Sequence, residues 1–312
     1  MEIKTKNIKI GKFRNTTISL PLLGVGEGEK KALIICGMHG DEFTGLSVIN
    51  SLLEQIKDQN MAGKLAILPI ANPLAVLACQ RETVLENLDL NRSFKFEDAQ
   101  ASFTQKIAEK LLDFSQDFDF VIDLHTFADP TGITAIFMDC GDKILNEETL
   151  PLIKLTNPDV IWRLDVKEDS SMLGSFGPLL ASKGIKNMAL EMPDHRVITC
   201  AQLERVVSGI KNILVSLKIL QSNNALPAPE TKIPIVNFNK IVSDYEGLFV
   251  SAVALQQHVI EGEKLGEVVD ITTQKRFEVI SPKKGIVFIA KNRDFVTVGD
   301  RLAVVGEILR EV

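Results

Sequence analysis

Two histidines and one glutamate stand where short apolar runs of the sequence end. His39 and Glu42 lie in the segment CGMHGDE, directly after one such run, and His125 ends another. Two imidazoles and one carboxylate, with a fourth position left for water, form the ligand set of a hydrolytic zinc centre. This mixed nitrogen and oxygen set favours zinc over magnesium. The sequence therefore predicts that His39, Glu42 and His125 hold one zinc ion per chain.

A further carboxylate, Glu191, follows a third apolar run. In open α/β sheets, ligands bind beyond the carboxyl ends of the strands, so the three runs are expected to deliver their polar groups to one crevice. A carboxylate outside the ligand set can take the proton of the attacking water and pass it to the leaving nitrogen. We therefore predict that Glu191 is the general base and acid.

Each of these residues also has a purely structural interpretation. The pair formed by His39 and Glu42 could mark a helix N-terminus, where an acid complements the helix dipole. His125 could be a hydrogen-bonded core histidine, and Glu191 could be the partner in an ion pair. The catalytic hypothesis is favoured because it accounts for all of these residues together.

The irregular stretch that contains DLNRSF supplies candidates for substrate binding. A guanidinium binds a carboxylate through two parallel hydrogen bonds, so Arg92 is expected to hold a substrate carboxylate, with Asn91 as a further donor. Arg81 is expected to face the scissile carbonyl and to stabilise its developing negative charge. The alternative for Arg81 is a surface ion pair with Glu82 or Asp89.

The elements that must position these residues alternate along the chain. Short apolar runs are typical of strands buried on both faces, and longer segments with apolar residues every three or four positions are typical of helices. This alternation predicts an α/β domain. The expected strands are Ala32–Cys36, Leu65–Ile70, Phe118–Leu124, Thr134–Met138, Val160–Leu164 and Asn187–Leu190. The expected helices are Thr44–Ile56, Glu97–Asp113 and Thr199–Leu220, with Thr199 as an N-cap.

The character of the chain changes after Leu220. Residues 223–232 (NNALPAPETK) are polar and contain two prolines, as linkers often do. Beyond them, glycines separate short runs rich in Val, Ile and Phe, which favours a small antiparallel sheet or barrel. We therefore predict a catalytic α/β domain over 1–222, a linker over 223–232 and an all-β domain over 233–312. The opening segment MEIKTKNIKI is expected to form an edge strand.

Composition narrows the classes of partner. The formal net charge is −6 and the pI is near 5.4, whereas nucleic-acid binding requires clustered basic surface. No apolar run approaches the roughly 20 residues of a membrane span, and the N-terminus lacks the apolar core of a signal peptide. The four cysteines form no CxxC pair, which fits reduced thiols. We expect a cytoplasmic protein that acts on a small molecule, and leave homo-oligomer formation open.

The motifs GMHGDE, DLNRSF, DLHT and LEM occur in the order found in the succinylglutamate desuccinylase and aspartoacylase family, which is related to zinc carboxypeptidases. The chain resembles this family over about residues 30–191, and more loosely over its whole length. The resemblance implies a mixed, mostly parallel sheet flanked by helices, followed by a small all-β domain. By position it implies these site residues: zinc ligands His39, Glu42 and His125, catalytic Glu191 and Arg81, and the substrate-binding pair Asn91 and Arg92.

The resemblance also implies a reaction. It predicts a metal-dependent hydrolase of linear amide bonds, of the deacylase or desuccinylase type, that removes an acetyl or succinyl group from an N-acyl amino acid. A zinc carboxypeptidase that acts on small peptides is the alternative, because it would use the same ligands and the same Arg92. A binding protein without catalysis would keep Arg92 but would need no general base. The family's glycine after the catalytic glutamate is replaced here by Met192-Pro193-Asp194-His195, so the loop is expected to shape the pocket differently.

Several residues outside the motifs are further candidates. Asp123 shares a strand face with His125 by the period of two, and is predicted to orient that imidazole. Near the C-terminus, SPKKGIV followed by VGDRL resembles half of a biotinyl or lipoyl carrier motif, for which a structural role is expected. The remaining candidates for substrate contact are His195, Arg163, Arg196 and Tyr245.

Overall fold

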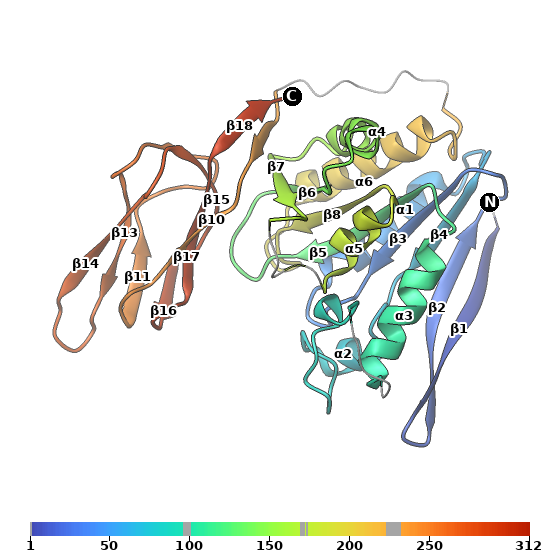
Figure 1. Cartoon of the computed structure of the whole chain (residues 1–312), viewed down its shortest axis with the longest axis horizontal. Helices are drawn as coiled ribbons and strands as arrows, with labels where there is room; N and C mark the ends of the chain where they lie inside the picture. Colours follow the sequence, from blue (N-terminus) through green and yellow to red (C-terminus); the bar gives the residue numbers. More distant parts are fainter. Residues whose placement is uncertain (1, 96–100, 169–171, 173, 223–231) are drawn as a thin grey trace.

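The computed structural model describes residues 2–95, 101–168, 172, 174–222 and 232–312 (Figure 1). The strands of the main sheet are β1 (Ile3–Phe13), β2 (Thr16–Val25), β3 (Lys31–Cys36), β4 (Lys64–Leu68), β5 (Phe120–Thr126), β6 (Thr134–Asp139), β7 (Val160–Asp165), β8 (Asn187–Met192), β9 (Pro234–Val236) and β18 (Ile308–Glu311). The helices are α1 (Thr44–Ile56), α2 (Pro73–Ala78), the 3₁₀ helix η1 (Leu90–Arg92), α3 (Phe103–Ser115), α4 (Lys143–Lys154), α5 (Phe176–Ser182) and α6 (Cys200–Ser216). The other strands are β10 (Asn239–Val242), β11 (Gly247–Ser251), β12 (His258–Val259), β13 (Lys264–Val269), β14 (Arg276–Ile280), β15 (Gly285–Ala290), β16 (Arg293–Val296) and β17 (Arg301–Gly306).

The main sheet is mixed, with the strand order β1-β2-β4-β3-β5-β8-β6-β7-β9-β18. Strands β4, β3, β5 and β8 run parallel to one another, whereas β6 pairs with β8 in the antiparallel sense and β7 and β9 follow the direction of β6. The mixed sheet with helices, and the antiparallel strands at the C-terminus, confirm the predicted fold class. This arrangement places the carboxyl ends of β3, β5 and β8 at one edge of the sheet, next to the first residue of β6.

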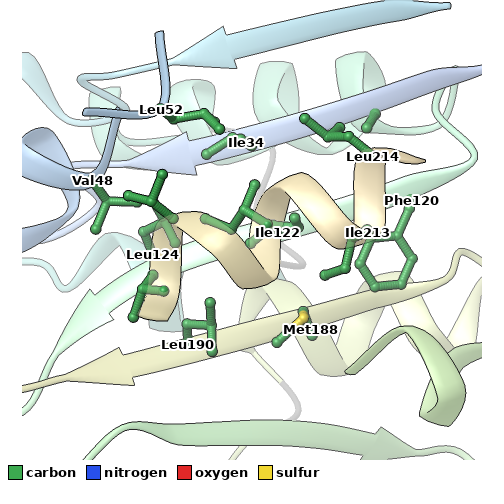
Figure 2. Close-up of a cluster of buried hydrophobic side chains, with 14 of the residues drawn as sticks. Ile34, Val48, Leu52, Phe120, Ile122, Leu124, Met188, Leu190, Ile213 and Leu214 are labelled. Carbon is green, nitrogen blue, oxygen red and sulfur yellow. The ribbon is translucent and has the colours of Figure 1, made fainter. Parts of the chain in front are cut away.

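Helices cover both faces of the sheet, as Figure 1 shows. One apolar core, part of which Figure 2 shows, lies between helices α1 and α6 and one face of the sheet, to which Ile122 and Leu124 of β5 point. A second core packs α3 and α5 against the opposite face, where Val121 of β5 points. Because side chains alternate along a strand, Asp123 and His125 point to the same face as Val121. The polar side chains of β5 therefore lie on the α3 and α5 side of the sheet.

Capping residues fix where two of the predicted helices begin. Helix α6 starts after Thr199, whose hydroxyl accepts a hydrogen bond from the backbone N of Gln202 at 3.2 Å, so the predicted N-cap is confirmed. Helix α3 starts after Ser102, which forms a capping box with Gln105. The capping box begins α3 at Phe103, and the predicted start at Glu97 lies outside the described residues. Strand β1 lies at the edge of the sheet, as predicted.

The segment 233–312 contributes to two parts of the structure. Its strands β9 and β18 extend the main sheet beyond β7. The rest forms two four-stranded sheets, β10-β17-β15-β12 and β14-β13-β11-β16. The predicted linker falls almost wholly outside the described residues, so the division into domains stays a prediction. Within the described chain, no helix combines the length and apolar character needed to cross a bilayer.

Candidate metal centre and active site

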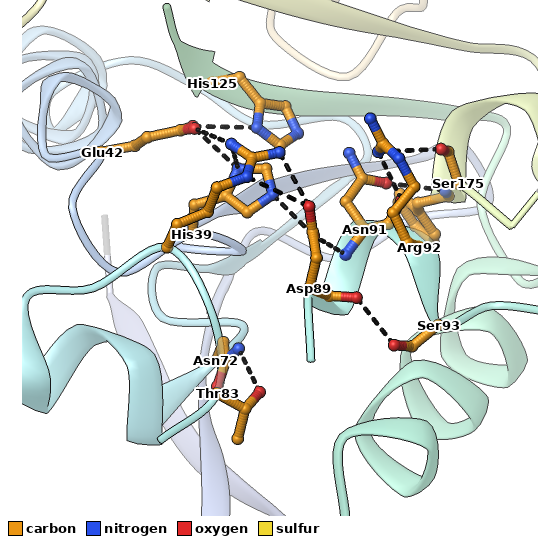
Figure 3. A network of polar contacts seen from close by, with 12 residues as sticks. His39, Glu42, Asn72, Thr83, Asp89, Asn91, Arg92, Ser93, His125 and Ser175 are labelled. Atoms are coloured by element: carbon orange, nitrogen blue, oxygen red, sulfur yellow. Dashed lines mark hydrogen bonds and ion pairs between the residues drawn. The ribbon is translucent and has the colours of Figure 1, made fainter. Parts of the chain in front are cut away.

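His39, Glu42 and His125 form a compact buried cluster at the carboxyl ends of β3 and β5 (Figure 3). One carboxylate oxygen of Glu42 lies 2.7 Å from Nδ1 of His39, and the other lies 3.0 Å from Nδ1 of His125. The three candidate ligand atoms lie within 4.8 Å of one another. Two imidazole nitrogens and a carboxylate that converge in this way could bind a metal ion.

Two glycines allow the loop after β3 to place His39 in this cluster. Gly37 has a φ of +67°, a conformation that side chains rarely adopt. At Gly40, a Cβ atom would lie 2.0 Å from the backbone oxygen of Ala75 in α2, and the Gly40 backbone N donates to the oxygen of Gln80 at 2.8 Å. The loop therefore packs directly on the backbone of α2, which fixes the direction of His39.

Each imidazole is held on its other side by a second carboxylate. Nε2 of His125 lies 2.8 Å from Oδ2 of Asp123, which confirms the predicted contact between these residues. Nε2 of His39 lies 3.0 Å from Oδ1 of Asp89. Carboxylates in this position orient metal-binding histidines and raise their basicity. The sequence suggested Asp89 only as an ion-pair partner of Arg81, and its position two residues before Asn91 was the signal for a further role.

Charge within the cluster shifts the pKa of each member. Burial lowers the pKa of His39, but its hydrogen bonds with Asp89 and Glu42 outweigh burial, and the net shift is upward. The pKa of His125 is raised for the same reason, with Asp123 and Glu42 opposing burial. For Glu42, burial raises the pKa, but the two histidines outweigh burial and hold it well below its usual range. The carboxylate of Glu42 is therefore ionised near neutral pH.

Glu191 lies beside the cluster on the neighbouring strand. In the parallel pairing of β5 with β8, Glu191 is the partner of His125, so both side chains point to the same face. Within the described residues its Oε2 atom is buried and has no hydrogen-bond partner. Burial raises the pKa of Glu191 to about 7, although His125 opposes the shift. A carboxyl group with such a pKa and a free oxygen is suited to both taking and giving a proton.

Asp89 also shapes the segment that carries Asn91 and Arg92. Its Oδ1 atom accepts a hydrogen bond from the backbone N of Asn91 at 2.7 Å and caps η1. The Oδ1 atom of Asn91 accepts from the backbone N of Phe176 at 2.9 Å. Arg92 donates through Nη1 to the backbone oxygen of Asn91 at 2.8 Å and to the hydroxyl of Ser175 at 3.1 Å. Within the described chain, no carboxylate lies within 4 Å of the Arg92 guanidinium, which leaves its charge available.

Arg81 forms the ion pair with Asp89 that the sequence left open, and it also reaches the cluster. It donates to Oδ2 of Asp89 through Nε at 3.2 Å and Nη2 at 2.9 Å. Its Nη1 atom lies 3.4 Å from Oε1 of Glu42, so the same guanidinium reaches the cluster. Burial raises the pKa of Asp89, but His39 and Arg81 outweigh burial and hold it well below its usual range. Arg81 is thus anchored by an ion pair beside the candidate ligands.

One cavity of about 640 Å³ unites the predicted site. It is lined by all seven predicted residues: His39, Glu42, Arg81, Asn91, Arg92, His125 and Glu191. It is also lined by three residues of the C-terminal segment that sequence reasoning missed: Phe238, Lys240 and Arg301. Phe238 and Lys240 stand in no motif, and Arg301 lies in the carrier-like stretch VGDRL, for which a structural role was expected. Only the packing of β10 and β17 beside the main sheet brings the three residues to the cavity.

Arg196 lines the cavity, but His195 does not. Arg196 donates through Nε to Oδ1 of Asp194 at 2.6 Å and is largely exposed. The ring of His195 lies 5.4 Å from that of Phe43, in an edge-on arrangement. Of the two candidates in this loop, only Arg196 reaches the cavity, and its charge is already paired.

Arg163 and Tyr245 lie away from the cluster. Arg163 donates to Asp139 at 2.6 Å and to Asp165 at 2.9 Å, and lines a different cavity against α4. Arg163 points to the opposite face of the sheet from Trp162, its neighbour on β7, because the side chains of adjacent strand residues point to alternate faces. Tyr245 stacks on Phe277, with ring centroids 3.7 Å apart. Neither residue is placed to contact a substrate in the cavity of the cluster.

The fold and the site define a class: an α/β protein with a candidate metal centre at the carboxyl ends of parallel strands. Residues 28–217 match the family model described as the succinylglutamate desuccinylase/aspartoacylase catalytic domain. The chain therefore belongs to the succinylglutamate desuccinylase/aspartoacylase family, as its motifs predicted.

Named relatives are N-acyl amino acid deacylases. The chain is 25% identical to the N-alpha-acetyl-L-2,4-diaminobutyric acid deacetylase of Halomonas elongata over 309 residues, which covers 95% of this chain and 87% of that protein. It is 23% identical to an N-acyl-aromatic-L-amino acid amidohydrolase (carboxylate-forming) of Xenopus laevis, over 65% of this chain and 68% of that protein. These names indicate amidohydrolase activity in the relatives.

Solved structures share the whole architecture. The product-bound ectoine utilization protein of Ruegeria pomeroyi matches with a TM-score of 0.84 and 23% identity, covering 97% of this chain and 95% of that one. A succinylglutamate desuccinylase/aspartoacylase from Rhodobacter sphaeroides matches with a TM-score of 0.83 and 20% identity, covering 98% and 96%. At these identities, the likeness establishes the fold.

Proposed function

We propose that this protein is a zinc-dependent amidohydrolase that removes the acyl group, acetyl or succinyl, from an N-acyl amino acid. The observation that carries the proposal is the pairing of His125 with Glu191. It places a buried carboxylate that has a free oxygen beside a cluster of two histidines and a glutamate. A non-catalytic binding site would not need that carboxylate.

The donor set of the cluster fits zinc. His39 and His125 direct Nδ1 atoms, and Glu42 a carboxylate, towards one point, and the far side of each ring is held by an acid. These are the atoms and supporting contacts that zinc sites use. When bound, the ion polarises the scissile carbonyl and lowers the pKa of its water.

The remaining residues divide the work of hydrolysis. Glu191 takes a proton from the attacking water and delivers it to the leaving nitrogen, so that the amine departs neutral. Arg81, fixed by Asp89, donates to the carbonyl oxygen as negative charge develops on it. Arg92 binds the free carboxylate of the substrate, and Asn91, whose carbonyl is already engaged, offers its NH₂ group to the same end.

Hydrolysis of a substrate panel tests the proposal. Release of free amino acid is measured from N-acetyl, N-succinyl and N-formyl amino acids, with and without a chelator, beside a set of dipeptides. The proposal expects turnover of acylated amino acids that stops on chelation and returns with zinc. Preference for dipeptides would support the carboxypeptidase alternative, and no turnover of either class by zinc-loaded protein would sink the proposal.

A variant pair separates catalysis from binding. Glu191→Gln removes the general base with little change of shape, and Glu148→Gln changes an exposed carboxylate of α4 as the matched control. The proposal expects Glu191→Gln to retain zinc and lose turnover, while Glu148→Gln keeps both. A cytoplasmic location stays a prediction from the sequence.

A further inference from the structure

The cavity at the candidate site has two chemically different halves. Around Glu191 and the histidines its wall is polar, whereas further along the sheet the wall is hydrocarbon. We call this second half the apolar chamber and define it by six lining side chains: Ile136, Met138, Trp162, Leu164, Met172 and Phe238.

Strand pairing explains why the apolar chamber lies beside the candidate general base. On β8, Ala189 is two residues before Glu191 and therefore points to the same face. Ala189 is the partner of Ile136 on β6, and Ile136 is the partner of Trp162 on β7. The floor of the chamber thus continues the sheet face of Glu191, one and two strands further on.

Aromatic rings form one wall of the chamber. The rings of Trp162 and Phe238 have centroids 4.4 Å apart and planes inclined by 34°. Phe238, from the segment after β9, is supported behind by an edge-on contact with Phe288 at 5.8 Å. Trp162, Met172 and Phe238 each keep part of their surface exposed. They therefore offer apolar surface that a ligand can cover.

Among the described residues, the charges around the cavity leave no partner for a second acidic group of a substrate inside the chamber. Three lining arginines are already in ion pairs: Arg81 with Asp89, Arg196 with Asp194 and Arg301 with Asp129. Arg92 is matched to one substrate carboxylate. The six described side chains that define the chamber carry no charge, so a charged group placed among them would lose hydration without gaining an ionic partner. Lys240, exposed on β10, is the cation that an acidic substituent would have to reach.

We propose that the apolar chamber binds an uncharged hydrocarbon group of the substrate, aliphatic or aromatic and larger than methyl. This group is carried either on the amino-acid side chain, beside an acetyl group, or on a longer uncharged acyl group that takes the place of the acetyl or succinyl group. The inference rests on the proposed deacylase function and names the substrate class of the same site. Burial of the group against Trp162 and Phe238 favours binding, because apolar surface of both the ligand and the protein is removed from water.

Fluorescence measures binding to the chamber without turnover. Trp162 is the single tryptophan of the sequence, so its emission reports on the chamber alone. Zinc-loaded Glu191→Gln protein is titrated with N-acetylphenylalanine, N-hexanoylalanine, N-acetylalanine and N-acetylaspartate. A saturable emission change with either of the first two, and a much weaker one with the last two, is expected.

Turnover of the same four compounds by the wild-type protein gives a second readout. The value of kcat/KM for N-acetylphenylalanine or N-hexanoylalanine should exceed that for N-acetylalanine by at least about 10-fold. The better of the two compounds tells whether the chamber holds the side chain or the acyl group. Phe238→Ala should reduce that advantage, whereas Phe295→Ala, which alters an exposed ring on β16, should not.

The outcomes separate this inference from the proposed function. Preference for N-acetylaspartate, lost in Lys240→Met, would overturn the inference and leave the deacylase function standing. Absence of all turnover would refute the function, and the Trp162 titration would still decide what the chamber binds. Should Phe238→Ala fail to fold, the wild-type substrate series and the titration decide the question.

Discussion

The carboxylate of Asp89 lies 3.0 Å from Nε2 of His39 and joins η1 to the metal-binding cluster. The same carboxylate binds Arg81 through two donors and caps η1 by accepting from the backbone of Asn91. One acid therefore sets the orientation of a candidate ligand, of the candidate oxyanion donor and of the segment that presents Arg92. Substitution of Asp89 should therefore impair both metal binding and catalysis.

Asp89→Asn should weaken metal binding by about 10- to 100-fold, because the amide no longer supports the His39 imidazole with a full negative charge. Asparagine keeps the ability to cap η1, so the change isolates the charge. Competition with a chromophoric chelator measures the affinity. Asp142→Asn, which alters the exposed N-cap of α4, is the control. Unchanged zinc affinity in Asp89→Asn would remove Asp89 from the metal site.

The purified protein should contain about one zinc ion per chain, and chelation should lower its Tm, because an ion bound only to the folded state stabilises that state. His125→Ala should lose the ion and show a Tm that no longer responds to chelator. His258→Ala alters an exposed histidine of β12 and should behave as wild type. Elemental analysis and thermal unfolding check both expectations, and equal zinc content in the two variants would contradict the assignment.

Activity should rise with pH as Glu191 ionises. Burial raises the pKa of Glu191 to about 7, and only the ionised form accepts a proton, so activity is lost as the pH falls through that value. A bound cation favours the carboxylate and moves the midpoint to lower pH. The profile of kcat/KM against pH measures the midpoint. Glu191→Gln should lower kcat by at least about 100-fold and abolish this rise; full activity in Glu191→Gln, with the same rise as wild type, would exclude Glu191 as the base.

Arg92→Ala should raise KM by about 10- to 100-fold with a smaller change in kcat, because it removes a charged contact present in the ground state and the transition state alike. Steady-state kinetics on an N-acyl amino acid, and on its amide lacking the free carboxylate, measure the effect. The amide should be insensitive to the change. Arg163→Lys, whose charge is paired with Asp139 and Asp165 away from the cluster, is the control and should leave KM nearly unchanged.

Asp129→Asn should destabilise the protein by about 1–3 kcal/mol, because it leaves two largely buried cations without a partner. Asp129 follows β5 and binds Lys291 at 2.8 Å and Arg301 at 2.6 Å, which attaches the C-terminal strands to the loop after His125. Urea unfolding measures the change. Glu307→Gln, which breaks an exposed pair with Lys283, should have little effect; equal stability of both variants would show that the Asp129 contacts are weak.

Local patterns in the sequence were sufficient for many elements of the fold. Helix α1 has the predicted bounds, Thr199 caps α6, and β3, β6, β7 and β8 lie where the apolar runs predicted them, whereas β5 lies two residues later than predicted. Such features depend on residues a few positions apart, whose periodicity and capping chemistry are written in the sequence. The direction of a strand cannot be predicted in this way, because β6 and β7 could run parallel or antiparallel to β8 until their pairing is known. Their reversal, and the extension of the sheet by β9 and β18, come from pairing over long distances along the chain.

The sequence by itself determined which residue types could bind a metal and activate water. The reason is that four such residues lie near the carboxyl end of a buried strand or in the loop after it: His39, Glu42, His125 and Glu191. Tertiary structure alone decided how those groups are supported and what surrounds them. It placed Asp89 beside His39, and it placed Phe238 against Trp162 to form an apolar wall. It also placed Arg163 in a different cavity, where it binds Asp139. The physical reason is that donor chemistry belongs to a single side chain, whereas orientation, pairing and pocket shape arise only when distant segments pack together.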